Sequence, residues 1–390
     1  MFSTRTNWQL APNRLTRALD DLRQSGQPIL DLTISNPTEA GVSPDAESVL
    51  QALVNPQALI YDPQPRGLLT SRQAVCHYYR EAHRVFELDP ERVVLTTSTS
   101  EAYSYVFRLL SNPGDEILVP KPSYPLFDFL ADLSDVKLIP YPLLYDHGWQ
   151  IDFDSLYKAA SPRTRAVILV HPNNPTGSYV SETEASALNA FCRSHSTALI
   201  VDEVFLDYAH DGEPRPSFAS NSDALTFTLS GLSKISALPQ MKFAWVATSG
   251  PEPAAAQASA RLEVIADTFL SMNAPIQLAA PTFLDLRKTI QPILLDRLRA
   301  NLSELDRRLA EHPACTRHQV DGGWYAILRI PILETDEDLC LRLLRNAHVS
   351  VHPGHFYDFP SEGHLILSLI TEPTIFSEGV SRLLQLAARN

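Results

Sequence analysis

The sequence predicts an α/β fold, with a mainly parallel, seven-stranded sheet covered by helices on both faces and a smaller α+β domain beside it. Two observations predict it. Between about residues 50 and 285, short apolar segments rich in β-branched residues alternate with longer amphipathic segments, which favours a parallel sheet. Several apolar segments are almost continuously hydrophobic, as is typical of strands that are buried on both faces.

The elements of the large sheet follow one another in the first 285 residues. Before the sheet, we expect a helix over residues 13–25 and a short strand over residues 29–33. The expected strands of the sheet are residues 93–96, 116–119, 137–140, 166–170, 198–201, 226–229 and 243–247. The amphipathic segments between them predict helices over residues 100–110, 152–160, 181–194 and 252–270.

The C-terminal part of the chain predicts the smaller domain. Leu and Arg recur at helical spacing from about residue 280 to 311, so we expect one long helix that links two domains. Beyond it we expect strands over residues 325–330 and 364–369 and helices over residues 337–346 and 375–388. A chain of 390 residues exceeds the usual size of one domain. The predicted division is a large domain, residues 46–285, and a small domain, residues 1–45 with 286–390.

Composition narrows the classes of function. The chain has 32 Lys and Arg against 45 Asp and Glu, a net charge of −13. Nucleic acids and anionic membranes bind clustered positive charge, so neither is an expected partner. No apolar run approaches the ~20 residues of a membrane span, and the first residues lack a signal peptide, so we expect a cytoplasmic protein. Four scattered cysteines are expected to be reduced core residues: Cys76, Cys192, Cys315 and Cys340.

Four polar loops follow predicted strands, and an open α/β sheet places its ligands there. They read Thr-Ser-Thr-Ser-Glu at residues 97–101, His-Pro-Asn-Asn-Pro-Thr-Gly at 171–177, Asp-Glu at 202–203 and Ser-Gly-Leu-Ser-Lys at 230–234. Neither a G-x-G-x-x-G fingerprint nor a P-loop motif is among them, so no dinucleotide or P-loop site is predicted. The order of the loops and their common position at one edge of the sheet predict a single site.

Each loop alone also has an ordinary structural explanation. Hydroxyl residues at 97–101 cap a helix as readily as they bind a phosphate, and residues 171–177 form a rigid turn. A carboxylate at Asp202 is costly to bury unless a protonated ring nitrogen, an arginine or water pairs with it. Lys234 would ordinarily be solvated, and it becomes a nucleophile only if burial or cationic neighbours lower its pKa. We expect Glu101 to face solvent at the start of a helix and Glu203 to pair with another side chain in a structural role.

Taken together, these motifs resemble the class I/II aminotransferases, the fold-type I enzymes that use pyridoxal 5'-phosphate (PLP), over nearly the whole chain. The most specific signal is Asn174-Pro-Thr-Gly177, then Asp202-Glu203, then Ser233-Lys234, each after an apolar strand. The remaining matches are Tyr61-x-Pro63 with Gly67, Ser98-Thr99-Ser100, Pro122-Ser-Tyr124-Pro125, Pro239, Lys242, Gly322-Gly-Trp-Tyr325 and Pro353-Gly-x-Phe356.

The resemblance implies a PLP-dependent aminotransferase (transaminase) of amino-acid metabolism. It would move an amino group from an amino acid, or another amine donor, to a 2-oxo acid. Lys234 would hold PLP as an internal aldimine and move the proton at the substrate α-carbon. Asp202 would keep the pyridine nitrogen protonated, Tyr124 would stack on the ring, and Asn174 would bind the ring oxygen O3′.

The resemblance also implies a phosphate site and an assembly. The phosphate would lie against Ser98, Thr99, Ser100, Ser233 and Lys242. Tyr61 would reach the phosphate of a neighbouring subunit, which implies a homodimer. His352 and His355 fall in the Pro-Gly loop of the resemblance and lack a third ligand in the sequence, so no metal site is predicted.

The sequence departs from the family pattern at four positions. Phe205, at the cofactor, replaces a tyrosine that donates to O3′, which should raise the pKa of the imine. Gly231 replaces a serine, and Lys242 replaces an arginine and loses its bidentate fork. Ile366 stands where the family has the arginine that binds the substrate α-carboxylate, a loss of about 1.5–3 kcal/mol. Either another cation substitutes, with Arg66 or His355 as candidates, or the substrate lacks a carboxylate held in this way.

Two other functions stay open at this point. The missing arginine motivates a different PLP reaction on the same fold, such as β-elimination, decarboxylation or oxidation and cyclisation of an amino acid. A non-catalytic PLP-binding regulator is a third possibility, but such regulators usually add a DNA-binding module, and the chain has no room or basic segment for one. Retention of both Lys234 and Asp202 favours catalysis.

Overall fold

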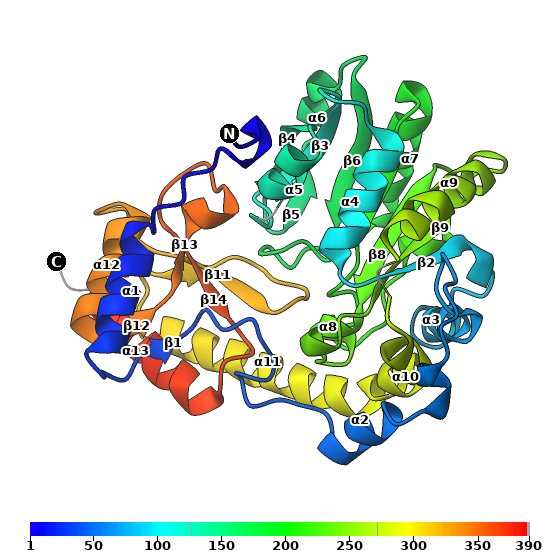
Figure 1. Ribbon diagram of the computed structural model, residues 1–390. Helices are drawn as coiled ribbons and strands as arrows, with labels where there is room; N and C mark the ends of the chain where they lie inside the picture. The colour runs from blue at the N-terminus through cyan, green and yellow to red at the C-terminus, as the bar shows by residue number, and fades with distance from the viewer. Residues whose placement is uncertain (126, 271, 388–390) are drawn as a thin grey trace.

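The computed structural model describes residues 1–125, 127–270 and 272–387 (Figure 1). Within these ranges no helix is both long enough and apolar enough to cross a membrane. Figure 1 shows two units: a large twisted sheet with its helices on the right and a smaller, mixed unit on the left.

The large sheet has eight strands within the described residues, in the order β2-β9-β8-β7-β6-β3-β4-β5. Five neighbouring strands, from β8 to β4, run parallel, whereas β9 runs against β2 and β8, and β5 runs against β4. The strand bounds are β2 (Val93–Thr96), β3 (Glu116–Lys121), β4 (Lys137–Tyr145), β5 (Trp149–Ile151), β6 (Thr164–Val170), β7 (Ala198–Asp202), β8 (Thr226–Gly231) and β9 (Ala244–Ser249).

The mainly parallel sheet is therefore confirmed, but the predicted count of seven strands is wrong. The eighth strand, β5, is a three-residue return at the sheet edge that pairs with the end of β4. A segment this short has no readable alternation of apolar and polar residues, so the sequence pattern missed it.

Helices cover both faces of the sheet, as predicted, and the strands show why. On β6, Ile168 packs on one face with α4 (Thr99–Leu110), α5 (Phe127–Leu133) and α9 (Ala254–Phe269). Its neighbour Leu169 packs on the other face with α6 (Phe153–Ala159) and α7 (Glu182–His195). Successive side chains of a strand point to opposite faces, so burial of both faces requires the continuous hydrophobic runs seen in the sequence.

A third group of helices covers the β2–β9 end of the sheet. It contains α2 (Ala46–Ala52), α3 (Leu69–His83), α8 (Leu232–Ile235) and α10 (Ala274–Asp285), whose apolar side chains pack on Trp245 of β9 and Leu95 of β2. The 3₁₀ turns are η1 (Thr4–Thr6), η2 (Pro56–Leu59), η3 (Pro90–Arg92), η4 (Phe218–Ser220), η5 (Pro239–Met241) and η6 (Gly354–Tyr357).

The smaller unit is built on an antiparallel sheet in the order β10-β11-β14-β13. Its strands are β10 (Thr316–Arg317), β11 (Tyr325–Arg329), β13 (His352–Pro353) and β14 (His364–Ser368). The N-terminal segment belongs here too, because β1 (Leu30–Asp31) pairs with β12 (Val349–Ser350). The helices of this unit are α1 (Arg14–Gln24), α12 (Asp336–Ala347) and α13 (Pro373–Ala387). Residue 388 of the predicted last helix lies outside the described residues.

The long linking helix predicted over residues 280–311 is present as α11 (Arg287–Leu309), but it starts later than predicted because a break at Leu286 separates it from α10. α10 packs against α3 and α11 packs against α13, so the helical segment changes direction where its packing partner changes. In Figure 1, α11 runs along the bottom of the view from the large unit to the small one. The division into domains at residues 45/46 and 285/286 stays a prediction, which the position of this bend supports.

Candidate active site

The four polar loops meet at one edge of the large sheet. Strands β6, β7 and β8 are parallel, and β2 has the same direction because β9 runs against both β8 and β2. The loops after these four strands therefore emerge together and surround a cavity of about 290 Å³. Nine of the predicted site residues line it: Ser98, Thr99, Ser100, Tyr124, Asn174, Asp202, Phe205, Ser233 and Lys234.

Lys234 lies in the cavity, on the short helix α8. The hydroxyl of Tyr208 donates to its carbonyl oxygen at 2.6 Å, which fixes the backbone. Its Nζ donates to the carbonyl of Ser35 at 3.1 Å and lies 4.6 Å from the ring centroid of Trp324. Burial lowers the pKa of Lys234 to about 8, although the charge of Asp202 acts in the opposite direction. A neutral, nucleophilic amine is therefore accessible near physiological pH.

Asp202 ends β7 and points its carboxylate into the same cavity. Its Oδ2 accepts a hydrogen bond from the hydroxyl of Tyr103 at 3.1 Å, and its Oδ1 accepts one from the N–H of Val204 at 3.1 Å. Burial raises the pKa of Asp202 to about 6, and these two donors and the charge of Lys234 partly offset that rise. The carboxylate is thus held ready to pair with a cationic group.

The loop after β6 places one unpartnered amide at the cavity. Asn174 is 7% exposed, and its Oδ1 has no hydrogen-bond partner among the described residues. Its neighbour Asn173 instead stabilises the loop, because its Nδ2 donates to Pro122 and Thr176. Gly177 ends the loop at φ +68°, and a Cβ there would lie 2.4 Å from a backbone oxygen of Gly322. The loop geometry therefore requires glycine.

The first turn of α4 borders the same cavity. Ser98 caps the helix, since its hydroxyl accepts from the N–H of Glu101 at 3.1 Å. Glu101 accepts from the N–H of Thr97 at 2.7 Å, so it is half-buried in the cap rather than solvated as expected. Thr99 and Ser100 follow in the first turn, where backbone N–H groups have no partner within a helix. Hydroxyls and a helix N-terminus together suit an anion such as a phosphate.

Two predicted residues lie away from the cavity lining. Lys242 is exposed at the end of η5, so its role at a phosphate stays a prediction. Tyr61 is 80% exposed and borders a separate groove of about 500 Å³, so any contact to a phosphate needs a second chain.

Neither candidate cation takes the place of the arginine that the family uses to bind the substrate α-carboxylate: the residue at its position is apolar, and the two candidates do not line the cavity. Ile366 is 1% exposed on β14 and lies opposite Ile327. Arg66, a candidate replacement cation, forms ion pairs with glutamates outside the cavity, Glu91 at 2.8 Å and Glu263 at 2.7 Å. The other candidate, His355, is exposed on η6. Neither candidate lines the cavity.

Sequence reasoning missed several residues that shape the site. Ser35 contacts Lys234 from 199 positions away in the chain, and Tyr103 hydrogen-bonds Asp202 from α4. Tyr325, quoted only as part of a motif, lines the cavity from β11. No local pattern links these residues to the four loops, because the contacts depend on how distant segments pack.

Comparison with known proteins agrees with this arrangement. Residues 7–375 match the family model of class I and II aminotransferases. The alanine aminotransferase of Mycobacterium tuberculosis is 30% identical over 362 residues, 90% of this chain and 83% of the relative. The glutamate-pyruvate aminotransferase AlaA of Haemophilus influenzae is 27% identical over 370 residues, 93% of this chain and 91% of the relative.

Solved structures share the fold. An alanine aminotransferase from Pyrococcus furiosus superimposes with a TM-score of 0.89 at 24% identity and covers 100% of both chains. An aminotransferase from Escherichia coli gives a TM-score of 0.86 at 24% identity and covers 100% of this chain and 98% of its own. The family match over nearly the whole chain, with these relatives, shows that the protein belongs to the class I and II aminotransferases.

Proposed function

We propose that this aminotransferase binds PLP at Lys234 and moves an amino group from an amino acid, or another amine donor, to a 2-oxo acid. The observation that carries the proposal is the pairing of Lys234 and Asp202 in one cavity. A lysine whose pKa is lowered to about 8 can attack an aldehyde, and a carboxylate beside it can hold a protonated ring nitrogen.

The residues of the cavity fit PLP. A volume of about 290 Å³ lies near the lower end of small-molecule sites, which suits a single small cofactor. The amide of Asn174, whose buried Oδ1 has no partner in the described chain, would hydrogen-bond the ring hydroxyl oxygen. The first turn of α4 and Ser233 would hold the phosphate, and Tyr124 would lie against the ring.

Bound PLP would supply an electron-withdrawing ring that stabilises negative charge at the substrate α-carbon. Asp202, held by Tyr103 and Val204, would keep a proton on the ring nitrogen and so preserve that withdrawal. Nζ of Lys234 would remove and return the proton at the substrate α-carbon. Tyr208 would keep this amine in place through its hydrogen bond to the lysine backbone.

The form in which the cofactor and the substrate leave the reaction distinguishes transamination from the other PLP reactions. Purified protein would be mixed with a panel of amino acids and simple amines, and the absorbance of the bound cofactor would be followed. Conversion to pyridoxamine phosphate that a 2-oxo acid reverses supports the proposal. Release of pyruvate or carbon dioxide without that conversion would assign elimination or decarboxylation instead.

A pair of lysine variants tests the assignment of the amine. Lys234→Ala should abolish both the cofactor absorbance and turnover, whereas Lys158→Ala, an exposed lysine on α6, should leave both unchanged. A colourless wild-type protein that ignores added PLP would overturn the proposed function.

We also expect a homodimer in which Tyr61 completes the partner's site. Support comes from exposed apolar side chains that line the 500 Å³ groove: Ile60 is 64% exposed and Leu270 60%. Mixing inactive Lys234→Ala chains with impaired Tyr61→Ala chains tests this directly. A mixed dimer would contain one site with both residues intact, so activity should return, and no recovery on re-association would contradict the shared site.

The cysteines bear on the location of the enzyme. All four (Cys76, Cys192, Cys315 and Cys340) are buried and free. Buried thiols without disulfides suit a reducing compartment, and we therefore place the enzyme in the cytoplasm. Fractionation of the native cells should recover the activity with the cytosol, and recovery from the cell envelope would contradict this placement.

A further inference from the structure

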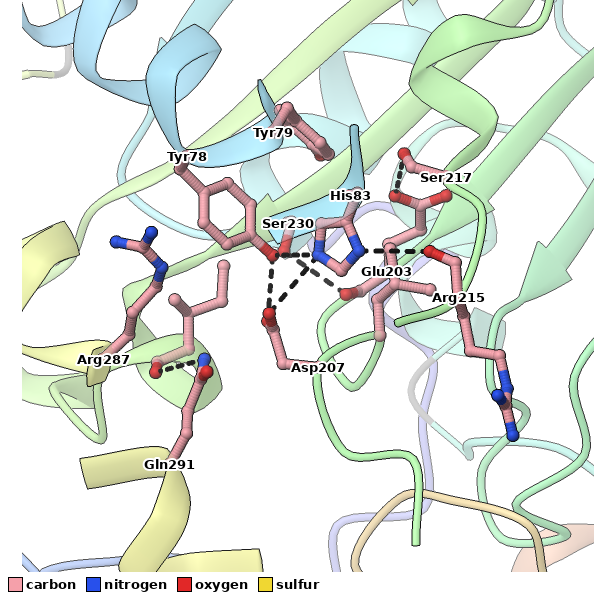
Figure 2. A network of polar contacts seen from close by, with 12 residues as sticks. Tyr78, Tyr79, His83, Glu203, Asp207, Arg215, Ser217, Ser230, Arg287 and Gln291 are labelled. Atoms are coloured by element: carbon pink, nitrogen blue, oxygen red, sulfur yellow. Dashed lines mark hydrogen bonds and ion pairs between the residues drawn. The ribbon is translucent and has the colours of Figure 1, made fainter. Parts of the chain in front are cut away.

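A buried polar network around His83 and Asp207 (Figure 2) shares no side chain with the cavity lining. The Nε2 atom of His83, at the end of α3, lies 3.3 Å from Oδ1 of Asp207. The hydroxyl of Tyr78 donates to Oδ2 of Asp207 at 2.9 Å and lies 3.0 Å from Nε2 of His83. The side chains of His83 and Asp207 are only 2% and 4% exposed. Burial of an ion pair this deep is costly, so it needs a specific explanation.

The hydrogen bonds of His83 define its charge. Its Nδ1 lies 3.1 Å from the carbonyl oxygen of Arg215, which can only accept. Its Nε2 faces the carboxylate of Asp207 and the oxygen of Tyr78, whose proton is already donated to Asp207. Both ring nitrogens therefore face acceptors, and only the imidazolium satisfies both. Burial lowers the pKa of His83, but the hydrogen bond and charge of Asp207 and the charge of Glu203 outweigh it, and the pKa is raised.

The other carboxylate of the network, Glu203, is held by neutral donors. It accepts the hydroxyl of Ser217 at 2.7 Å and the N–H of Phe218 at 2.7 Å, and its carbonyl oxygen accepts the hydroxyl of Ser230 at 3.4 Å. As Figure 2 shows, these bonds and those of His83 converge on the segment that follows β7. The segment 203–208 is therefore anchored by bonds to side chains that do not line the cavity.

The same short segment carries the contacts that place the reactive groups. It begins directly after Asp202, and it ends at Tyr208, whose hydroxyl donates to the carbonyl of Lys234. Between them, the ring of Phe205 lies 5.5 Å from Nζ of Lys234. Asp207 lies next to Tyr208 in the chain. A pair that fixes Asp207 therefore fixes the groups that orient Lys234.

We propose that His83 is a positioning residue for the reaction, which acts as an imidazolium that holds Asp207 and, through residues 203–208, sets the geometry of Lys234 and Asp202. Deprotonation of His83 would then release this segment as the pH rises. The effect on turnover rests on the proposed function, but the effect on the segment itself does not.

Three ionisable groups near His83 titrate outside the neutral range. Burial lowers the pKa of His171 to about 4, so it stays neutral across the neutral range, and burial raises the pKa of Tyr78 and Tyr79 well above it. Glu203, whose pKa is raised to about 7 by burial, does titrate near the neutral range. The groups around the network are Tyr78, Tyr79, Glu203, Asp207, His171, Arg215 and Arg287.

The first test uses wild-type protein without cofactor. NMR titration of labelled histidines should show His83 titrating above the ordinary histidine pKa of ~6.5. Hydrogen exchange of amides 203–208, corrected for the intrinsic effect of pH, should be slow below that pKa and should accelerate about tenfold above it. A His83 that titrates at or below the ordinary value, or an exchange rate independent of pH, would overturn the proposal without touching the proposed function.

The second test separates positioning from general stability. His83→Gln retains size and polarity but cannot carry the charge, and His77→Gln, an exposed histidine on the same helix, is the matched control. In His83→Gln, kcat should fall about tenfold, as expected for loss of one charge-assisted hydrogen bond, with KM within about twofold. The alkaline limb that His83 contributes to the kcat profile should also vanish. Equal kcat, pH profile and hydrogen exchange in both variants would refute the positioning role.

A Glu203→Gln variant assigns the titration. It removes the titration of Glu203, so an alkaline limb that persists in this variant and vanishes when His83→Gln is added belongs to His83. Loss of that limb in Glu203→Gln would contradict the proposal. If His83→Gln does not fold, the wild-type titration and exchange decide the matter alone.

Discussion

Replacing Asp202 by asparagine should lower the pKa of Lys234 further. Two influences act on this amine in the cofactor-free protein: burial lowers its pKa, and the negative charge of Asp202 raises it. Asp202→Asn removes the charge but retains the shape: the asparagine oxygen can still accept from the N–H of Val204, and the amide nitrogen, in place of Oδ2, can donate to the hydroxyl oxygen of Tyr103. Burial then acts without opposition.

The size of the effect follows from the environment of the amine. With a pKa of about 8, half of Lys234 is neutral at pH ~8, against ~0.4% of an unperturbed lysine with a pKa of ~10.4. When a cationic group loses a single nearby negative charge, its pKa typically falls by at least about 1. We therefore expect the pKa of Lys234 to fall to ~7 in Asp202→Asn, which makes the neutral amine predominant at pH 8.

The assay is the pH dependence of reductive methylation of Lys234 in protein stripped of cofactor, with the labelled methyl groups resolved by NMR. Lys234→Ala identifies the signal. Asp223→Asn, in which a carboxylate with 64% exposure is replaced, is the control and should leave the signal unchanged. An unchanged or raised pKa in Asp202→Asn would refute the electrostatic coupling between the two groups.

Three further predictions test the surroundings of the site. Asn174→Leu should weaken PLP binding about tenfold, because one hydrogen bond is lost. Equilibrium dialysis measures this affinity, and an unchanged affinity would show that Asn174 does not contact the cofactor. Gly177→Ala should lower the free energy of unfolding by more than ~2 kcal/mol, because its Cβ would meet a backbone oxygen of Gly322 in addition to the strain of a positive φ. Gly26→Ala, with φ +73° and nothing within 4 Å, isolates the strain alone, so equal losses in denaturant melts would contradict the clash. Burial raises the pKa of Glu203 to about 7, so the folded state binds a proton that the unfolded chain, with a pKa of ~4.3, has released. Stability of the cofactor-free protein should therefore fall as the pH rises from about 5 to 7, and urea melts of Glu203→Gln should show a shallower fall.

The sequence predicted the parts of the site that depend on strand ends. Asn174, Asp202 and Lys234 each follow a hydrophobic run, and a parallel sheet brings the ends of its strands to one edge, so order along the chain was enough to group them. The large sheet followed from the same runs, since burial on both faces leaves a strong pattern. A local pattern of this kind can be recognised in a single sequence.

The rest depended on contacts that no local pattern encodes. Ser35 and Tyr103 contact Lys234 and Asp202 only because distant segments pack together. Leu286 has no sequence feature that marks a bend, since the change of direction comes from different partners on its two sides. Tyr61 borders a groove on the surface, and its predicted contact needs a second chain.

The residues that surround Lys234 are far apart in the sequence, so the ribosome synthesises them at different times. The amine itself is in place once β8 and β9 have formed, but Trp324 and the strand that positions Ser35 arrive much later: Ser368 anchors the adjacent Ile34 by its side-chain hydroxyl. A chain that ends before Trp324 lacks one wall of the cavity that buries Lys234. Because burial is what lowers the pKa of this amine, we expect its reactivity with aldehydes to develop only when most of the chain has been synthesised.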